Sequence, residues 1–320
     1  MSARAGVVVL CALVLASQAL AQPKKPAAAP PPPAQPAENP NADLAYGAFQ
    51  RGRYLTAFAE ATKRAQQNDP VAMTLLGELY AQGLGVAQDD KKAADWYKLA
   101  TEHGDADAMF ALALFNLQGR GVPRSPDEAA RLLAAAAKLG HAAAAYDLGL
   151  LYLQGQQFPQ DFKRAAELFA QAATAGNSEA QYALATMYKE GRGVAKDETE
   201  AARLLQLASI AGNVDAMVEY AIAQFNGTGV AKDETAAARL LLIAARRGSA
   251  IAQDRLARVL MAGRGLPANP TEAIKWHIVS RTAGDSDPDL DAYAAQQPQA
   301  VRDAAEKAAQ KWMSTLPPRS

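Results

Sequence analysis

The chain of 320 residues lacks the features on which many functions depend. Its 33 basic and 33 acidic side chains cancel, and no basic block is long enough to follow a phosphate backbone, so electrostatics exclude nucleic acid as a partner. Cys11 is the one cysteine and lies in the N-terminal apolar run, so the rest of the chain can form no disulfide. Aromatic residues are few, whereas half of the residues are apolar and alanine is abundant. Such a composition fits either two ordinary domains or one helical array.

Signatures of catalysis and metal binding are also missing. None of His103, His141 and His277 has a second histidine or a cysteine at ligand spacing, and we expect these histidines at the surface or at helix caps. Residues 176–180 (GNSEA) lack the second glycine of a nucleophile elbow, so we interpret Ser178 as a residue of a helical first turn. The sequence therefore predicts no catalytic, cofactor-binding or metal-binding residues, and no enzyme.

The first residues resemble a signal for export. Arg4 precedes an apolar run, Val7–Leu15, that is much shorter than the ~20 residues needed to span a bilayer. Ala19, Leu20 and Ala21 then form a small-x-small cleavage site, which predicts a secretory signal peptide over residues 1–21. A single-span anchor is the alternative.

A linker follows the predicted cleavage site. Residues 22–40 are almost entirely alanine, proline and glutamine with two lysines, a composition that favours a flexible, disordered tether over a ligand for a proline-reading domain. After cleavage we expect no membrane span. The alanine-rich signal favours secretion through the Sec route to the bacterial periplasm.

The rest of the chain is repetitive, with a period of 36 residues. Two glycine columns mark the period: Gly83, Gly119, Gly155, Gly191, Gly227 and Gly263; and Gly104, Gly140, Gly176, Gly212, Gly248 and Gly284. Between the columns, apolar residues recur at helical spacing, which predicts two antiparallel helices per unit. Alanines at equivalent positions would let helix backbones approach closely, and stacked neighbours would complete the core.

Capping residues stand where these helices should begin. Five of the six residues expected to cap the first helices can accept a hydrogen bond, His141 being the exception. All six can do so at the second helices: Asp89, Ser125, Asp161, Asp197, Asp233 and Asn269.

The segments GELYAQGLGVAQDDKKAADWYKLATEHGD and MYKEGRGVAKDETEAARLLQLASIAGN resemble Sel1-like repeats, relatives of the tetratricopeptide repeat. This resemblance implies an all-α fold, a right-handed α-solenoid of antiparallel helix pairs with six repeats over residues 69–284. A partial repeat, the N-terminal helical hairpin of residues 41–68, would precede them. Residues 285–320 would form a C-terminal capping helix and tail, with a helix from Pro298 to Met313.

The loop GLGVAQDD at residues 83–90 invites a nucleotide-binding interpretation, which its context contradicts. Gln88 stands where a dinucleotide fingerprint needs a third glycine, and the preceding segment is helical. We interpret Gly83 as the left-handed residue that ends a helix. One copy of the loop deviates, because Gln157 replaces the second glycine in GQQF (155–158), and we expect a different backbone path there.

By analogy with tetratricopeptide repeats, the first helices would line a concave face. The positions expected there hold aromatic and aliphatic residues in adjacent units, as a peptide-binding groove requires. These candidate partner-binding residues are Phe110, Leu114, Leu117, Tyr146, Leu150, Leu153, Tyr182, Val218, Ile222 and Phe225. The alternative is that this stripe is core. In the last repeat the same positions hold Asp254, Arg258 and Met261, so we expect the groove to fade there.

The resemblance favours a secreted or periplasmic scaffold or adaptor that binds a peptide or helix of another protein, in envelope assembly, stress response or signalling. The alternative is a carbohydrate- or peptidoglycan-associated envelope component of the exopolysaccharide export type. The sequence names no partner protein and fixes no oligomeric state.

Overall fold

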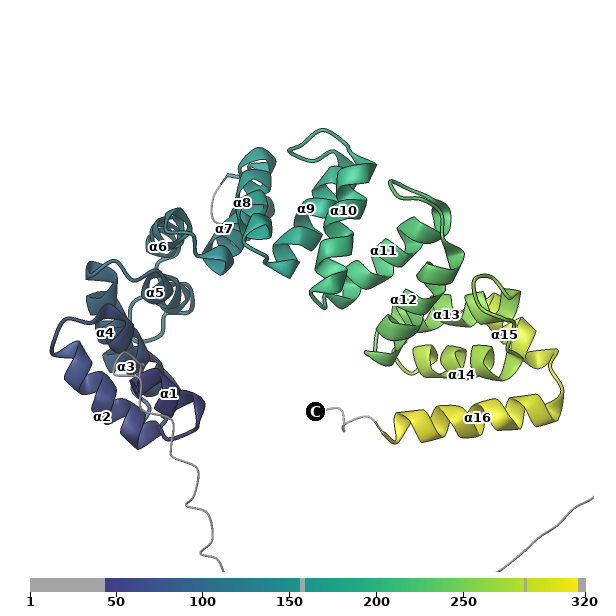
Figure 1. The fold of residues 1–320 in the computed structure, drawn as a ribbon, viewed down its shortest axis with the longest axis horizontal. Coiled ribbons are helices and arrows are strands. Elements are labelled where there is room, and N and C mark those ends of the chain that lie inside the picture. Colours follow the sequence, from purple (N-terminus) through teal and green to yellow (C-terminus); the bar gives the residue numbers. More distant parts are fainter. Residues whose placement is uncertain (1–43, 156–158, 285–286, 316–320) are drawn as a thin grey trace, which may run out of the picture. The chain divides into compact units, whose positions relative to one another are not determined.

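The computed structural model describes residues 44–155, 159–284 and 287–315, which form helices and connecting loops without a β-strand (Figure 1). The predicted signal peptide and linker, and the deviant turn at 156–158, lie outside these residues. The helices are α1 (Leu44–Gln50), α2 (Tyr54–Ala65), α3 (Pro70–Gln82), α4 (Asp90–Glu102), α5 (Ala106–Gln118), α6 (Pro126–Lys138), α7 (Ala142–Gln154), α8 (Phe162–Thr174), α9 (Ser178–Glu190), α10 (Glu198–Ile210), α11 (Val214–Asn226), α12 (Glu234–Arg246), α13 (Ala250–Ala262), α14 (Pro270–Arg281), α15 (Pro288–Ala295) and α16 (Gln299–Met313).

From α3 to α14 the helices form six pairs, each packed against the next, so the described chain is an α-solenoid. The odd-numbered member of each pair is called the first helix here and the even-numbered member the second helix. A backbone hydrogen bond closes each pair: the N–H of Asp89, which caps α4, donates to the carbonyl of Tyr80 in α3 at 3.0 Å. The same bond joins Asp197 to Tyr188 at 3.0 Å in the fourth pair.

The predicted caps form. At every second helix from α4 to α14 the side chain of the N-cap residue accepts a hydrogen bond from a backbone N–H of the first turn. His141 was expected to be the exception among the first helices, which is wrong: its Nδ1 accepts a hydrogen bond from the N–H of Ala144 at 3.0 Å. An imidazole nitrogen that carries no proton is an acceptor, so all six first helices are capped.

The core within a pair depends on matched sizes of side chain. Gly77 in α3 faces the ring of Tyr97 in α4, and a Cβ on Gly77 would lie 2.5 Å from a ring carbon. Gly149 and the ring of Phe169 repeat this relationship two pairs later, at 2.7 Å. In the other pairs alanine stands at the glycine position, as at the fully buried Ala185. A large ring is therefore accommodated only where the opposite helix has no side chain.

In the pairs whose loop has a second glycine, that loop contacts the preceding helices. Gly193 lies against the carbonyl of Phe162, the first residue of α8, and a Cβ on Gly193 would overlap it. The residue before this glycine adds a second contact, because the Arg192 guanidinium lies over the Phe162 ring at 5.6 Å. In an equivalent loop Arg120 binds Asp90, the first residue of α4, at 2.6 Å. Register between successive pairs is thus set at these loops.

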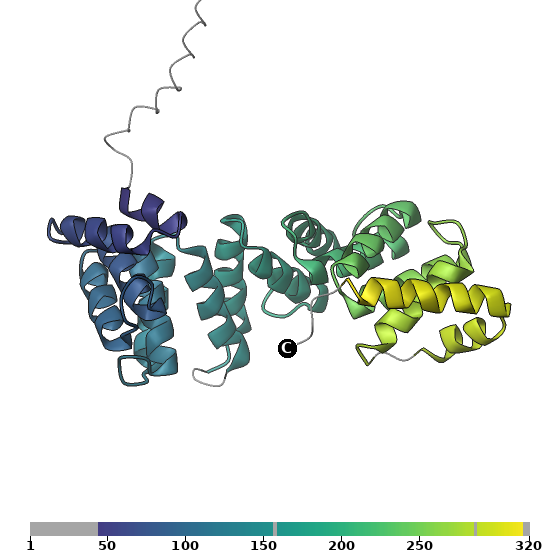
Figure 2. The ribbon, with the colours of Figure 1, turned by 90° about the horizontal axis from the view of Figure 1, so that it is seen from below.

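At the C-terminal end, α16 packs against α14, and Figure 2 shows it in yellow. The predicted helix from Pro298 begins one residue later, with Pro298 as its N-cap residue. Trp312 meets Trp276 edge to face, with ring centroids 5.3 Å apart. Lys275 lies over both rings, at 4.3 Å from Trp276 and 5.6 Å from Trp312, and its ammonium binds Glu272 at 3.1 Å.

Candidate functional site

The candidate groove residues form a row along the first helices that is neither fully core nor fully exposed. Nine of the ten are partly buried, and eight of these pack against the core clusters. Val218 is the exception: it is 4 % exposed and belongs to the core, so its place in the predicted groove is wrong. Some of the row is held by aromatic contacts, since Phe110 stacks on His141 at 4.6 Å and Tyr146 packs on Phe169 at 5.6 Å.

Three hollows along this row are each lined by side chains of successive first helices, and a fourth, of about 230 Å³ between α9 and α11, is lined by Ile222 together with Lys189 and Glu219. The N-terminal hollow, of about 330 Å³, includes Leu114; the central hollow, of about 370 Å³, includes Tyr146, Leu153 and Tyr182; and the C-terminal hollow, of about 290 Å³, includes Ile222 and Phe225. Phe110, Leu117 and Leu150 line none of these three hollows. Six of the ten predicted residues therefore line a hollow, and they are divided among these three hollows.

The central hollow combines aromatic and acidic groups. Tyr146 and Tyr182 contribute phenols, and Glu179 and Asp215 contribute carboxylates from the first turns of α9 and α11. Burial raises the pKa of Tyr182, and the charges of Glu219 and Asp215 raise it further. The phenols therefore stay protonated at neutral pH and can donate hydrogen bonds.

Acidic character continues on the neighbouring helices. Burial raises the pKa of Asp147 in α7, although the nearby His141 partly opposes the shift. Burial also raises the pKa of Glu78 in α3, which lines the N-terminal hollow and accepts a hydrogen bond from Gln82 at 3.0 Å. Partly buried carboxylates of this kind favour a cationic neighbour.

The C-terminal hollow, unlike the acidic central hollow, is lined mainly by apolar and basic residues. Its floor is made by Ala221, Leu241 and Val259, which are buried, and its walls include Phe225 and Met261. At the last repeat the first-helix positions hold Asp254 and Arg258, and Arg258 lines this hollow. Buried residues of α11, α12 and α13 add apolar surface that those positions do not provide.

Three arginines line this same hollow. Arg264 lies over the Phe225 ring at 4.3 Å and binds Glu234 at 2.5 Å. Arg258 binds Asp287 at 2.6 Å. Arg255 is exposed and has no hydrogen bond or ion pair with any residue that the structure describes. We had not predicted Arg255 or Arg264 as site residues, although Arg264 stands between two glycines of the repeat loop, where a signal was available.

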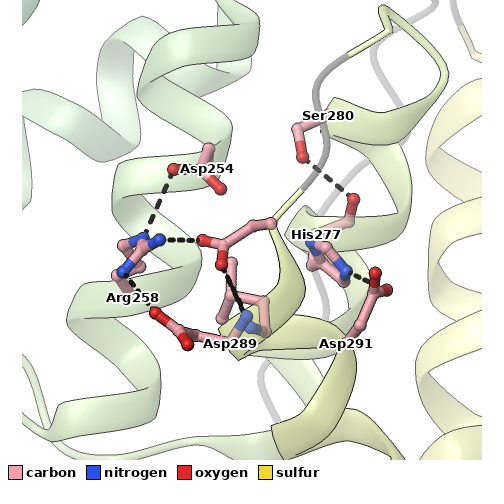
Figure 3. Close-up of polar contacts among 8 residues, drawn as sticks. Asp254, Arg258, His277, Ser280, Asp289 and Asp291 are labelled. Carbon is pink, nitrogen blue, oxygen red and sulfur yellow. Dashed lines mark hydrogen bonds and ion pairs between the residues drawn. The ribbon is translucent and has the colours of Figure 1, made fainter.

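The Arg258 cluster anchors α15 to α13 (Figure 3). Besides Asp287, the Arg258 guanidinium approaches Asp254 and Asp289, each at 3.6 Å. Asp287 also caps α15 by accepting hydrogen bonds from the N–H groups of Asp289 and Leu290. Burial opposes the ionisation of Asp287, yet these N–H groups and Arg258 together hold its pKa below the usual range. The buried carboxylate is therefore paired, and it holds α15 against α13.

His277, Ser280 and Asp291 look at first like a catalytic set (Figure 3). His277 Nε2 lies 2.8 Å from Asp291 Oδ1, but the Ser280 hydroxyl donates to the carbonyl of His277 at 2.9 Å and not to its ring. His277 Nδ1 is buried and has no hydrogen-bond partner among the described residues. A nucleophile next to a base, the minimum for this chemistry, is not formed.

The predicted position of His277 is wrong, because the side chain is buried and not at the surface or a cap. It stands 36 residues after Leu241, at the core position that Tyr97 and Phe169 occupy in other pairs. His103 is exposed at the C-cap of α4 and His141 caps α7, as expected.

Within the described residues, no three or more histidine, cysteine, aspartate or glutamate side chains are grouped to hold a metal ion. The same part of the chain contains no helix with the length and apolar character required to cross a membrane.

Comparisons with known proteins give a consistent result for the fold. A crystal structure of a Sel1 repeat protein from Oxalobacter formigenes is 27 % identical and superposes with a TM-score of 0.63, over 81 % of this chain and all of the other. The structure of c5321, described as a protective antigen present in uropathogenic Escherichia coli strains and displaying an SLR fold, is 24 % identical with a TM-score of 0.55, over 87 % of this chain and 71 % of that one. At that identity the likeness concerns the fold. Comparison with curated proteins gives no significant match.

The family model for the Sel1 repeat matches the chain in six consecutive units, residues 70–105, 106–141, 142–177, 178–213, 214–249 and 250–285. These units coincide with the helix pairs α3–α4 to α13–α14, with their capped starts and glycine-ended first helices. This chain belongs to the Sel1 repeat family.

Proposed function

We propose that this chain is a secreted scaffold or adaptor that binds a peptide or helix of another protein along its first helices. Sel1 repeat proteins generally mediate protein–protein interactions. The observation that carries the proposal is the row of three hollows between successive first helices, into which six of the predicted groove residues project. Side chains of an extended or helical segment could enter such hollows at intervals.

The proposed compartment is the bacterial periplasm, where the protein would act in envelope assembly, stress response or signalling. This part rests on the sequence: the short apolar run and small-x-small site of residues 1–21, and the proline- and alanine-rich residues 22–40 that would tether the solenoid.

A second candidate function is association with an envelope carbohydrate. The central hollow favours it, because Tyr146 and Tyr182 stand beside Asp215 and Asn213. The amide oxygen of Asn213 is already used, however, since it accepts the hydrogen bond that caps α11. The apolar floor of the C-terminal hollow suits a peptide better, so we retain protein binding as the leading proposal.

Affinity capture from envelope extract tests the proposal. We expect the tagged chain to recover discrete partner proteins, and a Leu153→Ala/Tyr182→Ala variant in the central hollow to recover several-fold less. The matched control is Leu207→Ala/Ile210→Ala in α10, which removes two exposed apolar side chains of a second helix. Circular dichroism must show that both variants keep their helices. Equal recovery by all three chains would overturn binding at the first helices, and retention of soluble glycan without protein would favour the carbohydrate alternative.

A further inference from the structure

The chemistry of the C-terminal hollow specifies its occupant. Building on the proposed function, we infer that this hollow binds a segment of a partner protein in which a carboxylate side chain lies next to an aliphatic or aromatic side chain.

The apolar half of the inference rests on the floor and walls of the hollow. Ala221 and Leu241 are 0 % and 3 % exposed, and Val259 is 6 % exposed, so the floor is core surface that has almost no contact with water except through the opening. Partly buried Phe225 and Met261 rise beside it. Filling this space with an aliphatic or aromatic side chain removes apolar surface from water on both molecules.

The evidence for a carboxylate in the partner segment is the set of charged side chains at the rim of the hollow. Arg255, Arg258 and Arg264 line the hollow, whereas no carboxylate does so among its described lining residues. Arg258 is paired with Asp287 and approached by Asp254 and Asp289, and Arg264 is paired with Glu234, so among the described side chains Arg255 carries the unpaired positive charge of the rim. None of these four carboxylates lines the hollow. The side chains of Arg258 and Arg264 are about half exposed, so both still contribute positive potential at the opening.

Arg255 gives the sharpest indication. Its guanidinium has no partner in the described chain. The equivalent positions of two earlier repeats hold acidic residues, Asp147 and Glu219, so the positive charge is particular to this repeat. A carboxylate that enters the hollow would meet this free cation and could accept two parallel hydrogen bonds from it.

The central hollow supports the charge assignment by contrast. Glu179, Glu190 and Asp215 line it, and the one cation among its described lining residues, Arg192, is paired with Glu190 at 3.1 Å. The charged lining side chains therefore differ between the two hollows: mostly carboxylates line the central hollow, and arginines line the C-terminal hollow. A partner segment with a carboxylate at the C-terminal hollow is attracted there and repelled from the central hollow, which fixes its position along the row.

An anionic polysaccharide could pair with the arginines, but it has no apolar side chain to pack against the floor of the hollow. Recognition of a sugar needs amides, hydroxyls or carboxylates that bind its hydroxyl groups, and among the described residues Asn226 is the one uncharged polar side chain that lines the hollow. A surface of alanine, leucine and valine leaves sugar hydroxyls unpaired, which is unfavourable on desolvation. The apolar floor therefore favours a peptide.

Fluorescence polarisation with four synthetic probes tests the inference on the purified full chain. The first is a short peptide of glutamate, leucine and phenylalanine. The second replaces each glutamate by lysine, the third replaces each leucine and phenylalanine by serine, and the fourth is an oligogalacturonate of similar length. We expect the first probe to bind about tenfold or more tightly than each of the others.

Two matched variants locate the binding. Arg255→Gln removes a cation that pairs with nothing in the described chain, so it should leave the fold intact and weaken the first probe about tenfold. Arg239→Gln removes an exposed arginine of α12 that does not line the hollow, and it should change the affinity less than twofold.

Equal binding of the acidic and basic peptides, tighter binding of the oligogalacturonate, or an unchanged affinity of Arg255→Gln would overturn the inference. Any of these results together with partner capture that depends on Leu153 and Tyr182 would leave the proposed function standing. If capture is independent of those residues, the proposed function itself fails.

Discussion

Gly193, in the loop between α9 and α10, lies against the backbone carbonyl of Phe162 at the start of α8, with no space for a side chain between them. Gly121 meets Asp90 and Gly229 meets Glu198 in the same way in other repeats. The loop glycine that suggests a phosphate-binding turn is thus a contact between successive repeats. Since the hollows lie between successive first helices, these contacts help to set their width.

A pair of variants in one loop tests this role. Gly191 and Gly193 both have φ of 70°, so alanine at either position adopts a left-handed backbone at a cost of roughly 1–2 kcal/mol. A Cβ on Gly191 would meet Lys196 at an ordinary 3.4 Å, whereas one on Gly193 would overlap Phe162. We therefore expect Gly193→Ala to lower the free energy of unfolding by about 1–3 kcal/mol more than Gly191→Ala, as measured by urea denaturation. Equal losses would show that the contact is unimportant.

The match between glycine and an aromatic ring predicts a strong coupling within the third repeat. Gly149→Ala should destabilise the protein by about 1–3 kcal/mol, because the new methyl group overlaps the Phe169 ring. Combined with Phe169→Leu, the same substitution should be tolerated, since it creates the alanine–leucine pair that the next repeat has at Ala185 and Leu205. A double-mutant cycle measures this, and additive effects would contradict it.

Acid should weaken the contact between the last two repeats. Hydrogen bonds from Arg264, and then from Lys232, lower the pKa of Glu234 from 4.5 to about 2. A carboxyl whose pKa is lowered by folding stabilises the folded state above its ordinary pKa, and this contribution is lost as the pH falls from 4.5 towards 2. The stability difference between wild type and Glu234→Gln should therefore be largest at neutral pH and shrink across that window. A difference that does not change with pH would refute the assignment.

His277→Leu separates a packing role from a chemical one. The histidine occupies a buried position that leucine fills in the preceding repeat, at Leu241, and its Nδ1 has no partner in the described structure. Because an unpaired buried polar atom is unfavourable, we expect leucine to raise the free energy of unfolding by about 1 kcal/mol in thermal or urea denaturation. A large loss of stability would indicate that the contact of His277 with Asp291 outweighs this cost.

The helices and their ends could be predicted from the sequence because their chemistry is local. Asp89 caps the helix that begins beside it and Gly83 ends the helix before it, and each signal recurs in six repeats. The burial of His277 was also readable, since it stands in register with Leu241.

The hollows could not be predicted from the equivalent positions of the first helices alone. The C-terminal hollow needs Leu241 from a second helix, Phe225 from the first helix of that pair, and Arg255 from the next repeat. Their convergence depends on the packing between pairs, which the loop contacts set. The same packing buries Val218, although it shares a column with partly buried Tyr146 and Tyr182.

Photo-crosslinking in the native host tests most directly the claim that first helices hold a protein partner. A photoreactive amino acid at Ile222, which lines the C-terminal hollow, is compared with one at Leu207, an exposed apolar residue of a second helix. We predict discrete protein adducts at Ile222 that the acidic, apolar peptide suppresses, and none at Leu207. Adducts at Leu207 with none at Ile222 would contradict the account and place the partner on the second helices.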